Sequence, residues 1–204
     1  MANENKHEQA IAHLQSVSSI NPNDLSARFL LAQQLLKSGH PEEALAEFTQ
    51  VFQADPNNEE ALLERVKLLH WKGRYKEALD DLEKAHTQYP QKWQTAVMLA
   101  YLLAASPQYD LRDGARALSL AQLVYAATGS LEHGVLVGLA LSELGRCSEA
   151  AEWQRKLIAA AEEQRKDDLI AKLKADLQRY EKAQSCRPAG VSSRKDSLPP
   201  GKNP

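Results

Sequence analysis

The six histidines are the residues of this chain best suited to binding a metal or transferring a proton, and they stand at positions 7, 13, 40, 70, 86 and 133. No two of them form the pattern His-Glu-x-x-His, and none is spaced from a cysteine as in a zinc site. His7 and His13 are six residues apart, so on a helix they point to different sides. We therefore expect solvated histidines and no metal.

Other stretches that resemble catalytic or binding motifs lack the residues that the chemistry needs. The stretch DPNNEE, which begins at Asp55, lacks the glycine and the distant glutamate of a calcium loop. The chain has no glycine-rich phosphate loop, nucleophile elbow or kinase signature. Cys147 has no basic partner in the sequence that would mark it as a nucleophile. The sequence therefore predicts no catalytic residue, no cofactor and no enzymatic activity.

Composition and charge indicate which classes of function are excluded and in which cellular compartment we expect the protein. The formal net charge is -2 over 204 residues, so we expect the chain to lack the concentrated basic surface of nucleic-acid-binding proteins. Cys147 and Cys186 are the only cysteines, and Cys186 lies in a polar stretch, so we expect no disulfide and a reducing compartment. The amino-terminal MANENKHEQA lacks the apolar core of a secretory signal, and no run of about 18 apolar residues occurs. These features predict a cytoplasmic protein that neither binds nucleic acid nor inserts into a membrane.

The elements that would position any site repeat every 34 residues. The stretch GHPEEALAEF from Gly39 returns as GRYKEALDDL from Gly73, and prolines recur at positions 22, 56 and 90. Alanines recur at 44 and 78, and then at 117, because about five residues are inserted within SPQYDLRDG. A fixed period of this length indicates stacked supersecondary units.

Each unit is predicted to be a pair of helices, which makes the chain all-α. Apolar residues follow a helical period, glycine suits the end of the first helix, and proline suits the start of the second. We expect a half repeat at 6–22, repeats at 24–56, 58–90, 92–129 and 131–162, a capping helix at 163–183 and a disordered tail at 184–204.

These repeats resemble the tetratricopeptide repeat (TPR) family. The resemblance rests on two sets of residues, Ala32, Gly39, Ala44, Phe48 and Pro56, and then Val66, Gly73, Ala78, Leu82 and Pro90. Arg28 and Arg65 depart from the pattern, because they stand where the family places apolar packing residues. The resemblance implies a right-handed superhelix of helix pairs, and the insertion is similar to variants in bacterial members.

The resemblance also implies where a partner would bind, because ligands of the family lie on the concave side lined by the first helices. The positions projected onto that side are Phe29, Leu63 and Val97 in one row, Gln33, Lys67 and Tyr101 in the next, and His70 one turn further. Lys67 is the only cation among them, so a groove that traps a terminal carboxylate is disfavoured. We expect a peptide or an amphipathic helix of a partner protein to bind there.

Two alternatives remain open at this level. The residues Ile170, Leu173, Leu177 and Tyr180 have coiled-coil spacing, so the terminal helix could pair with a copy of itself and make a homodimeric scaffold. The chain could also be an accessory subunit of a separately encoded enzyme, since its repeats leave no room for a catalytic domain.

Overall fold

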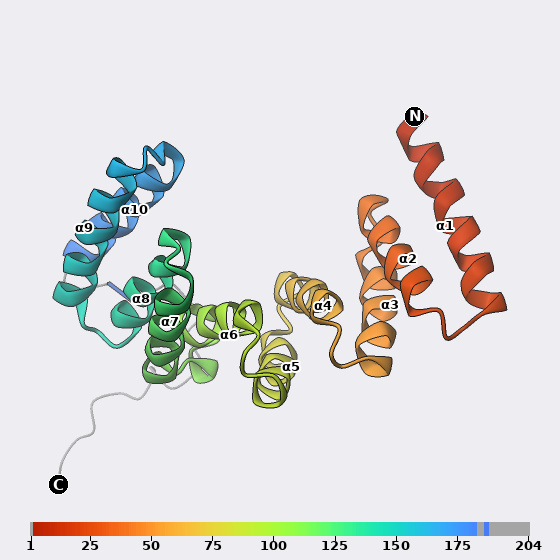
Figure 1. Ribbon diagram of the computed structural model, residues 1–204, viewed down its shortest axis with the longest axis horizontal. Coiled ribbons are helices and arrows are strands. Elements are labelled where there is room, and N and C mark those ends of the chain that lie inside the picture. The colour runs from red at the N-terminus through yellow and green to blue at the C-terminus, as the bar shows by residue number, and fades with distance from the viewer. Residues whose placement is uncertain (1, 183–185, 188–204) are drawn as a thin grey trace, which may run out of the picture. The chain divides into compact units, whose positions relative to one another are not determined.

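The computed structural model describes residues 2–182, 186 and 187, with side chains from His7 onward, and within this part it contains α-helices, one short 3-10 helix and no strand (Figure 1). The chain divides into two compact units, one ending at Tyr89 and the other beginning at Pro90. The amino-terminal unit contains α1 (Ala2–Ile20), α2 (Leu25–Lys37), α3 (Pro41–Ala54), α4 (Glu59–Trp71) and α5 (Tyr75–Gln88). The carboxyl-terminal unit contains α6 (Trp93–Ala105), η1 (Tyr109–Leu111), α7 (Gly114–Thr128), α8 (Leu131–Glu143), α9 (Cys147–Glu163) and α10 (Asp167–Glu181).

The 34-residue period is visible at the helix ends of the amino-terminal unit. Asp24 caps α2 by accepting a hydrogen bond from the Ala27 amide at 2.9 Å, and Asn58 caps α4 in the same way at 3.0 Å from Ala61. Gly39, just beyond α2, has a φ of 79°, a left-handed conformation that glycine adopts without steric cost. The repeated polar residues and glycines therefore start and stop the first helix of each pair.

The recurring alanines are buried in the second helix of each pair, where the sequence pattern places the crossing of the two helices. Ala44, Ala78, Ala117 and Ala150 are all fully buried, with 0% of their surface exposed. Small side chains at these positions let the helix axes approach closely. Larger residues one turn along, such as Phe48 and Leu82, fill the core beside them.

Replacing Ala78 by leucine is expected to lower the free energy of unfolding by about 1–3 kcal/mol, because the added methylenes overpack this crossing. Urea denaturation followed by circular dichroism measures the change. Ala46→Leu is the matched control, because Ala46 is exposed on α3. Equal midpoints for the two variants would contradict the assigned crossing.

The two arginines that depart from the family pattern form ion pairs inside their helix pairs. Arg28 Nη1 lies 2.9 Å from Glu47 Oε2, and Arg65 Nη1 lies 2.6 Å from Asp81 Oδ2. Glu47 and Asp81 are 34 residues apart, so both repeats place an acid at the same position of the second helix. Burial raises the pKa of Asp81, and the charge of Arg65 opposes that rise. The arginines thus keep a helix-packing role, although it is an electrostatic one.

The inserted loop between α6 and α7 is fastened by Arg112. Its Nε donates to the Ser106 carbonyl at 2.6 Å, and its Nη1 lies 2.8 Å from Glu143 Oε2 at the end of α8. The guanidinium also stacks on the ring of Tyr109, 4.4 Å from its centroid. The loop is therefore tied to the end of the next first helix.

The terminal helix α10 packs against α9 and covers its core face. Leu173 and Tyr180 are almost fully buried, and the buried Gln154 donates from Nε2 to the Leu173 carbonyl at 3.1 Å. The apolar stripe considered above for pairing with a second copy is thus used within the chain. Self-association through that stripe would require α10 to leave α9.

The expectation that the chain has no disulfide is wrong, since Cys147 is bonded to Cys186. Cys186 falls in the predicted tail, yet it is buried among core residues of the carboxyl-terminal unit. The rest of that tail lies outside the described residues, apart from Arg187. Cysteine usage consequently gives no support to a reducing compartment.

Candidate functional site

Five of the seven predicted partner-binding residues belong to the amino-terminal unit. Phe29 and Gln33 lie on α2, and Leu63, Lys67 and His70 lie on α4. All are half-buried except Lys67, which is exposed and pairs with Glu64 at 2.6 Å. The ring of Phe29 packs edge-on against Phe48, with centroids 5.4 Å apart. Phe29 therefore contributes to the helix pair as well as to its surface.

His70 is enclosed at the end of α4. Its ring packs edge-on against Tyr75 at the start of α5, with centroids 5.1 Å apart. Burial lowers the pKa of His70, because the charged imidazolium loses hydration there. The neutral ring is the favoured form at neutral pH, which suits packing and hydrogen bonding better than attraction of an anion.

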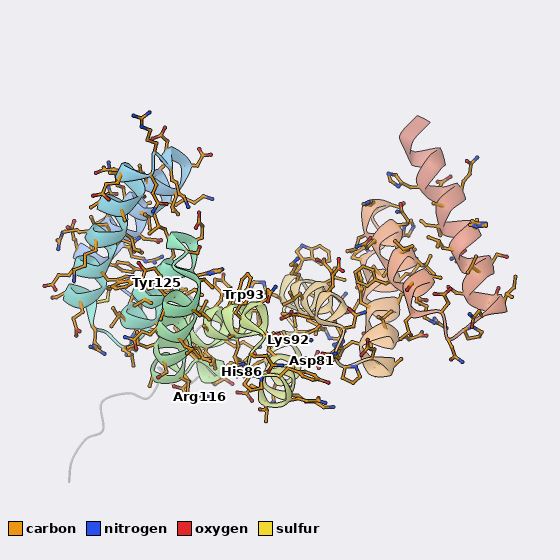
Figure 2. The ribbon with its side chains drawn as sticks, viewed as in Figure 1. Asp81, His86, Lys92, Trp93, Arg116 and Tyr125 are labelled. Atoms are coloured by element: carbon orange, nitrogen blue, oxygen red, sulfur yellow. A yellow bond between two sulfur atoms is a disulfide. The ribbon has the colours of Figure 1, made fainter. Side chains whose placement is uncertain are left out.

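The other two predicted residues, Val97 and Tyr101, lie on α6 in the carboxyl-terminal unit. Trp93 precedes Val97 by four residues, so Trp93, Val97 and Tyr101 follow one face of that helix. Trp93 lies at the amino end of α6 (Figure 2) and is 43% exposed. Tyr101 is 39% exposed. Two aromatic side chains with this much exposure are an unusual feature of an otherwise buried helix.

The sequence reasoning missed the equivalent residues of α8. Counting back from Gly145, as Leu63 and Lys67 are counted back from Gly73, gives Val135 and Leu139. Both are half-buried, and α8 packs beside α6. They were missed because the inserted loop breaks the 34-residue count. We call Trp93, Val97, Tyr101, Val135 and Leu139 the α6–α8 face.

Contacts across α6, α7 and α8 hold this face in place. The rings of Trp93 and His133 are 5.1 Å apart, and Thr128 Oγ1 lies 2.9 Å from Nδ1 of His133. Val97 and Leu139 both pack on one buried cluster of the unit. The side chains of the face are therefore presented by rigid helices, which lowers the entropic cost of binding.

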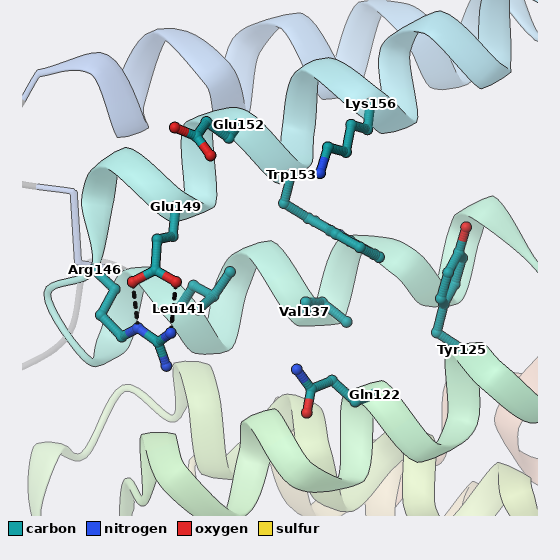
Figure 3. Close-up of a pocket in the computed structure, with 9 residues that line it drawn as sticks. All are labelled: Gln122, Tyr125, Val137, Leu141, Arg146, Glu149, Glu152, Trp153 and Lys156. Carbon is teal, nitrogen blue, oxygen red and sulfur yellow. Dashed lines mark hydrogen bonds and ion pairs between the residues drawn. The ribbon is translucent and has the colours of Figure 1, made fainter.

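A separate pocket of about 420 Å³ lies between α7, α8 and α9 (Figure 3). Val137 is on its floor, and the rings of Tyr125 and Trp153 meet edge-on with centroids 5.2 Å apart. The indole of Trp153 donates to the Gly134 carbonyl at 2.8 Å, which fixes the ring. On the rim, the dashed lines in Figure 3 join Arg146 to Glu149. This pocket offers apolar and charged contacts but no nucleophile beside a base.

The described residues hold no group of three or more histidine, cysteine, aspartate or glutamate side chains that could bind a metal ion. Within the same part of the chain, the helices are too short or too polar to cross a bilayer.

Comparison with known proteins agrees with the repeat pattern. The family model for the tetratricopeptide repeat matches residues 2–63 and 35–80. No curated protein sequence matches this chain.

Several solved structures share the fold. A TPR protein from Parabacteroides merdae has a TM-score of 0.74 at 16% identity, over 89% of this chain and 70% of that one. MamA has a TM-score of 0.66 at 17% identity, over 81% of this chain and 94% of that one. YrrB, described as a TPR protein with an unusual peptide-binding site, has a TM-score of 0.57 at 22% identity, over 71% and 72%.

The family match covers the first helix pairs, and the structural likeness extends over the later ones. The buried alanines Ala44 and Ala78 and the left-handed glycines Gly39 and Gly73 are residues on which the resemblance rested. The sequence of residues 2–80 matches the tetratricopeptide repeat, and the chain has the fold of solved proteins built from that repeat.

Proposed function

We propose that this protein is a non-enzymatic interaction module that binds an apolar segment of a partner protein on its first helices. The observation that carries the proposal is the α6–α8 face, where exposed Trp93 and Tyr101 flank Val97 on one side of α6. Aromatic residues are the side chains that most often dominate binding energy at protein interfaces. The peptide-binding site named for YrrB is consistent with this role but belongs to that protein.

The side chains of the α6–α8 face indicate which kind of partner segment would bind there. Its five side chains are uncharged, so a ligand would be held mainly by the apolar area that it buries on the face. Taken by itself, the amino-terminal unit has the corresponding residues Phe29, Gln33, Leu63 and Lys67, of which only Lys67 is a cation. An extended apolar peptide or the apolar side of an amphipathic helix fits these properties better than an acidic tail does.

Selection of peptides from a random library against the full chain tests this function. We expect the enriched peptides to be rich in apolar residues and to bind Trp93→Ala and Tyr101→Ala at least about tenfold more weakly than the parent, since truncated interface anchors cost roughly 2 kcal/mol or more. Fluorescence anisotropy of a labelled peptide measures the affinity, and circular dichroism checks the fold.

Leu123→Ala is the matched control, because Leu123 is 60% exposed on α7 and is not a residue of the α6–α8 face. Its affinity should equal that of the parent. Peptides that bind all variants equally would contradict the proposal, and loss of binding only in Leu123→Ala would place the site on the second helices.

A further inference from the structure

The disulfide joins the first residue of α9 to a residue beyond the end of α10. Cys147 and Cys186 are 39 residues apart, and their Cα atoms are 5.8 Å apart. The bond therefore closes a loop that contains both α9 and the terminal helix. It fixes the chain that follows α10 to the amino end of α9.

The two cysteines have different access to solvent. Cys186 is 2% exposed, and its Sγ lies 3.8 Å from the Ser142 carbonyl oxygen within the core cluster that includes Tyr180. Cys147 is half-buried and lines a surface pocket of about 320 Å³ together with Ser148, Arg155 and Tyr180. An external reagent consequently meets Cys147 first.

We propose that Cys147–Cys186 is a thiol–disulfide exchange site, at which a dithiol reductant attacks Cys147 Sγ through this pocket. The reductant's thiolate forms a bond to Cys147 Sγ while the Cys147–Cys186 bond breaks, and its electron pair leaves with Cys186, which takes a proton from water. The second thiol of the reductant then attacks the reductant's own sulfur in the mixed disulfide and releases Cys147. The protein disulfide is reduced by two electrons, and the dithiol becomes a disulfide.

The position of Cys147 also makes it the cysteine that reacts first when the reduced protein is re-oxidised. It is the first residue of the 17-residue helix α9 and lines the surface pocket, so its sulfur is within reach of an external disulfide after reduction. Reduced Cys147 is therefore reactive towards a disulfide, whereas Cys186 is sheltered by the core. Re-oxidation begins at Cys147 and closes on Cys186.

Reduction acts on the end of α10 without removing the helix from α9. Gln154 and Leu173 hold the middle of α10 by a buried hydrogen bond, independently of the disulfide. Near the disulfide, Arg155 and Glu181 form an exposed ion pair at 2.7 Å, which is weak in water. We expect faster hydrogen exchange in the last turn of α10 after reduction and unchanged exchange around Leu173.

Dithiothreitol applied to the folded, full chain tests the proposal. We expect reduction under native conditions within about tenfold of the rate in denaturing urea, with the circular dichroism of the helices retained. Alkylation and mass spectrometry count the thiols formed. Reduction that occurs only after unfolding would overturn the proposal and leave the disulfide with a purely structural role.

Two single variants identify the reactive sulfur. Cys186→Ser leaves Cys147, which should react with oxidised glutathione at least about tenfold faster than the Cys186 left in Cys147→Ser. Equal rates, or a faster Cys186, would overturn the assignment of Cys147 as the attacked residue. The native reduction of the unmodified chain remains a valid test if either variant is unstable.

Discussion

Replacing Arg112 by alanine is expected to lower the free energy of unfolding of the carboxyl-terminal unit by about 3–5 kcal/mol, because it removes one partner of a buried ion pair. The side chain of Arg112 is 1% exposed, and that of Glu143 is 13% exposed. Without the guanidinium, the Glu143 carboxylate and the Ser106 carbonyl lose their charged donor in a poorly hydrated place. Urea denaturation followed by circular dichroism, with hydrogen exchange to locate the effect, measures the loss.

Arg146→Ala is the matched control, because Arg146 also pairs with a glutamate through two short hydrogen bonds. That pair is exposed, with 45% of the Arg146 side chain and 54% of Glu149 accessible. Water and salt screen an exposed pair of this kind, so Arg146→Ala should be almost neutral for stability. If the two variants lost equal stability, the assignment of Arg112 as the fastener of the inserted loop would be wrong.

The repeated elements were predictable from sequence because their causes are local. A capping Asp24 or Asn58, a left-handed Gly39 and a crossing Ala44 each act within one helix pair, so the same residue returns wherever the same backbone is needed. Their agreement at one period predicted the all-α repeat fold.

The residues that sequence reasoning missed act between distant parts of the chain. Arg112 reaches Glu143 across 31 positions, and Cys147 reaches Cys186 across 39, with no periodic signal in either case. The polar composition around Cys186 predicted disorder, although a single covalent bond is enough to hold that residue in the core. Val135 and Leu139 of the α6–α8 face were recoverable by counting back from Gly145.

The inserted loop also helps to position the α6–α8 face. Arg112 ties the longer loop to the end of α8, whose preceding turns carry Val135 and Leu139. The loop that breaks the repeat period therefore supports the helix that completes the α6–α8 face. We expect Arg112→Ala to weaken peptide binding only as far as it loosens α8.

The second large loss of stability is expected from truncating Leu173 of α10. This side chain is 0% exposed and packs between α9 and α10. The Leu173 backbone carbonyl also accepts the hydrogen bond of the buried Gln154. Stacked repeats need a terminal helix of this kind, which covers the last core face and leaves a polar outer side. Loss of packing at Leu173 consequently affects the whole end of the carboxyl-terminal unit.

Leu173→Ala is expected to lower the free energy of unfolding by about 2–5 kcal/mol, the range for a leucine truncated in a well-packed core. Urea denaturation measures this change, and sedimentation velocity detects the self-association that an uncovered α9 would promote. Leu123→Ala removes the same atoms from a side chain that is 60% exposed, so it should cost less than about 0.5 kcal/mol. If Leu173→Ala matched this control, α10 would not be the cap of the repeat stack, and its apolar stripe would again be available for pairing with a second copy.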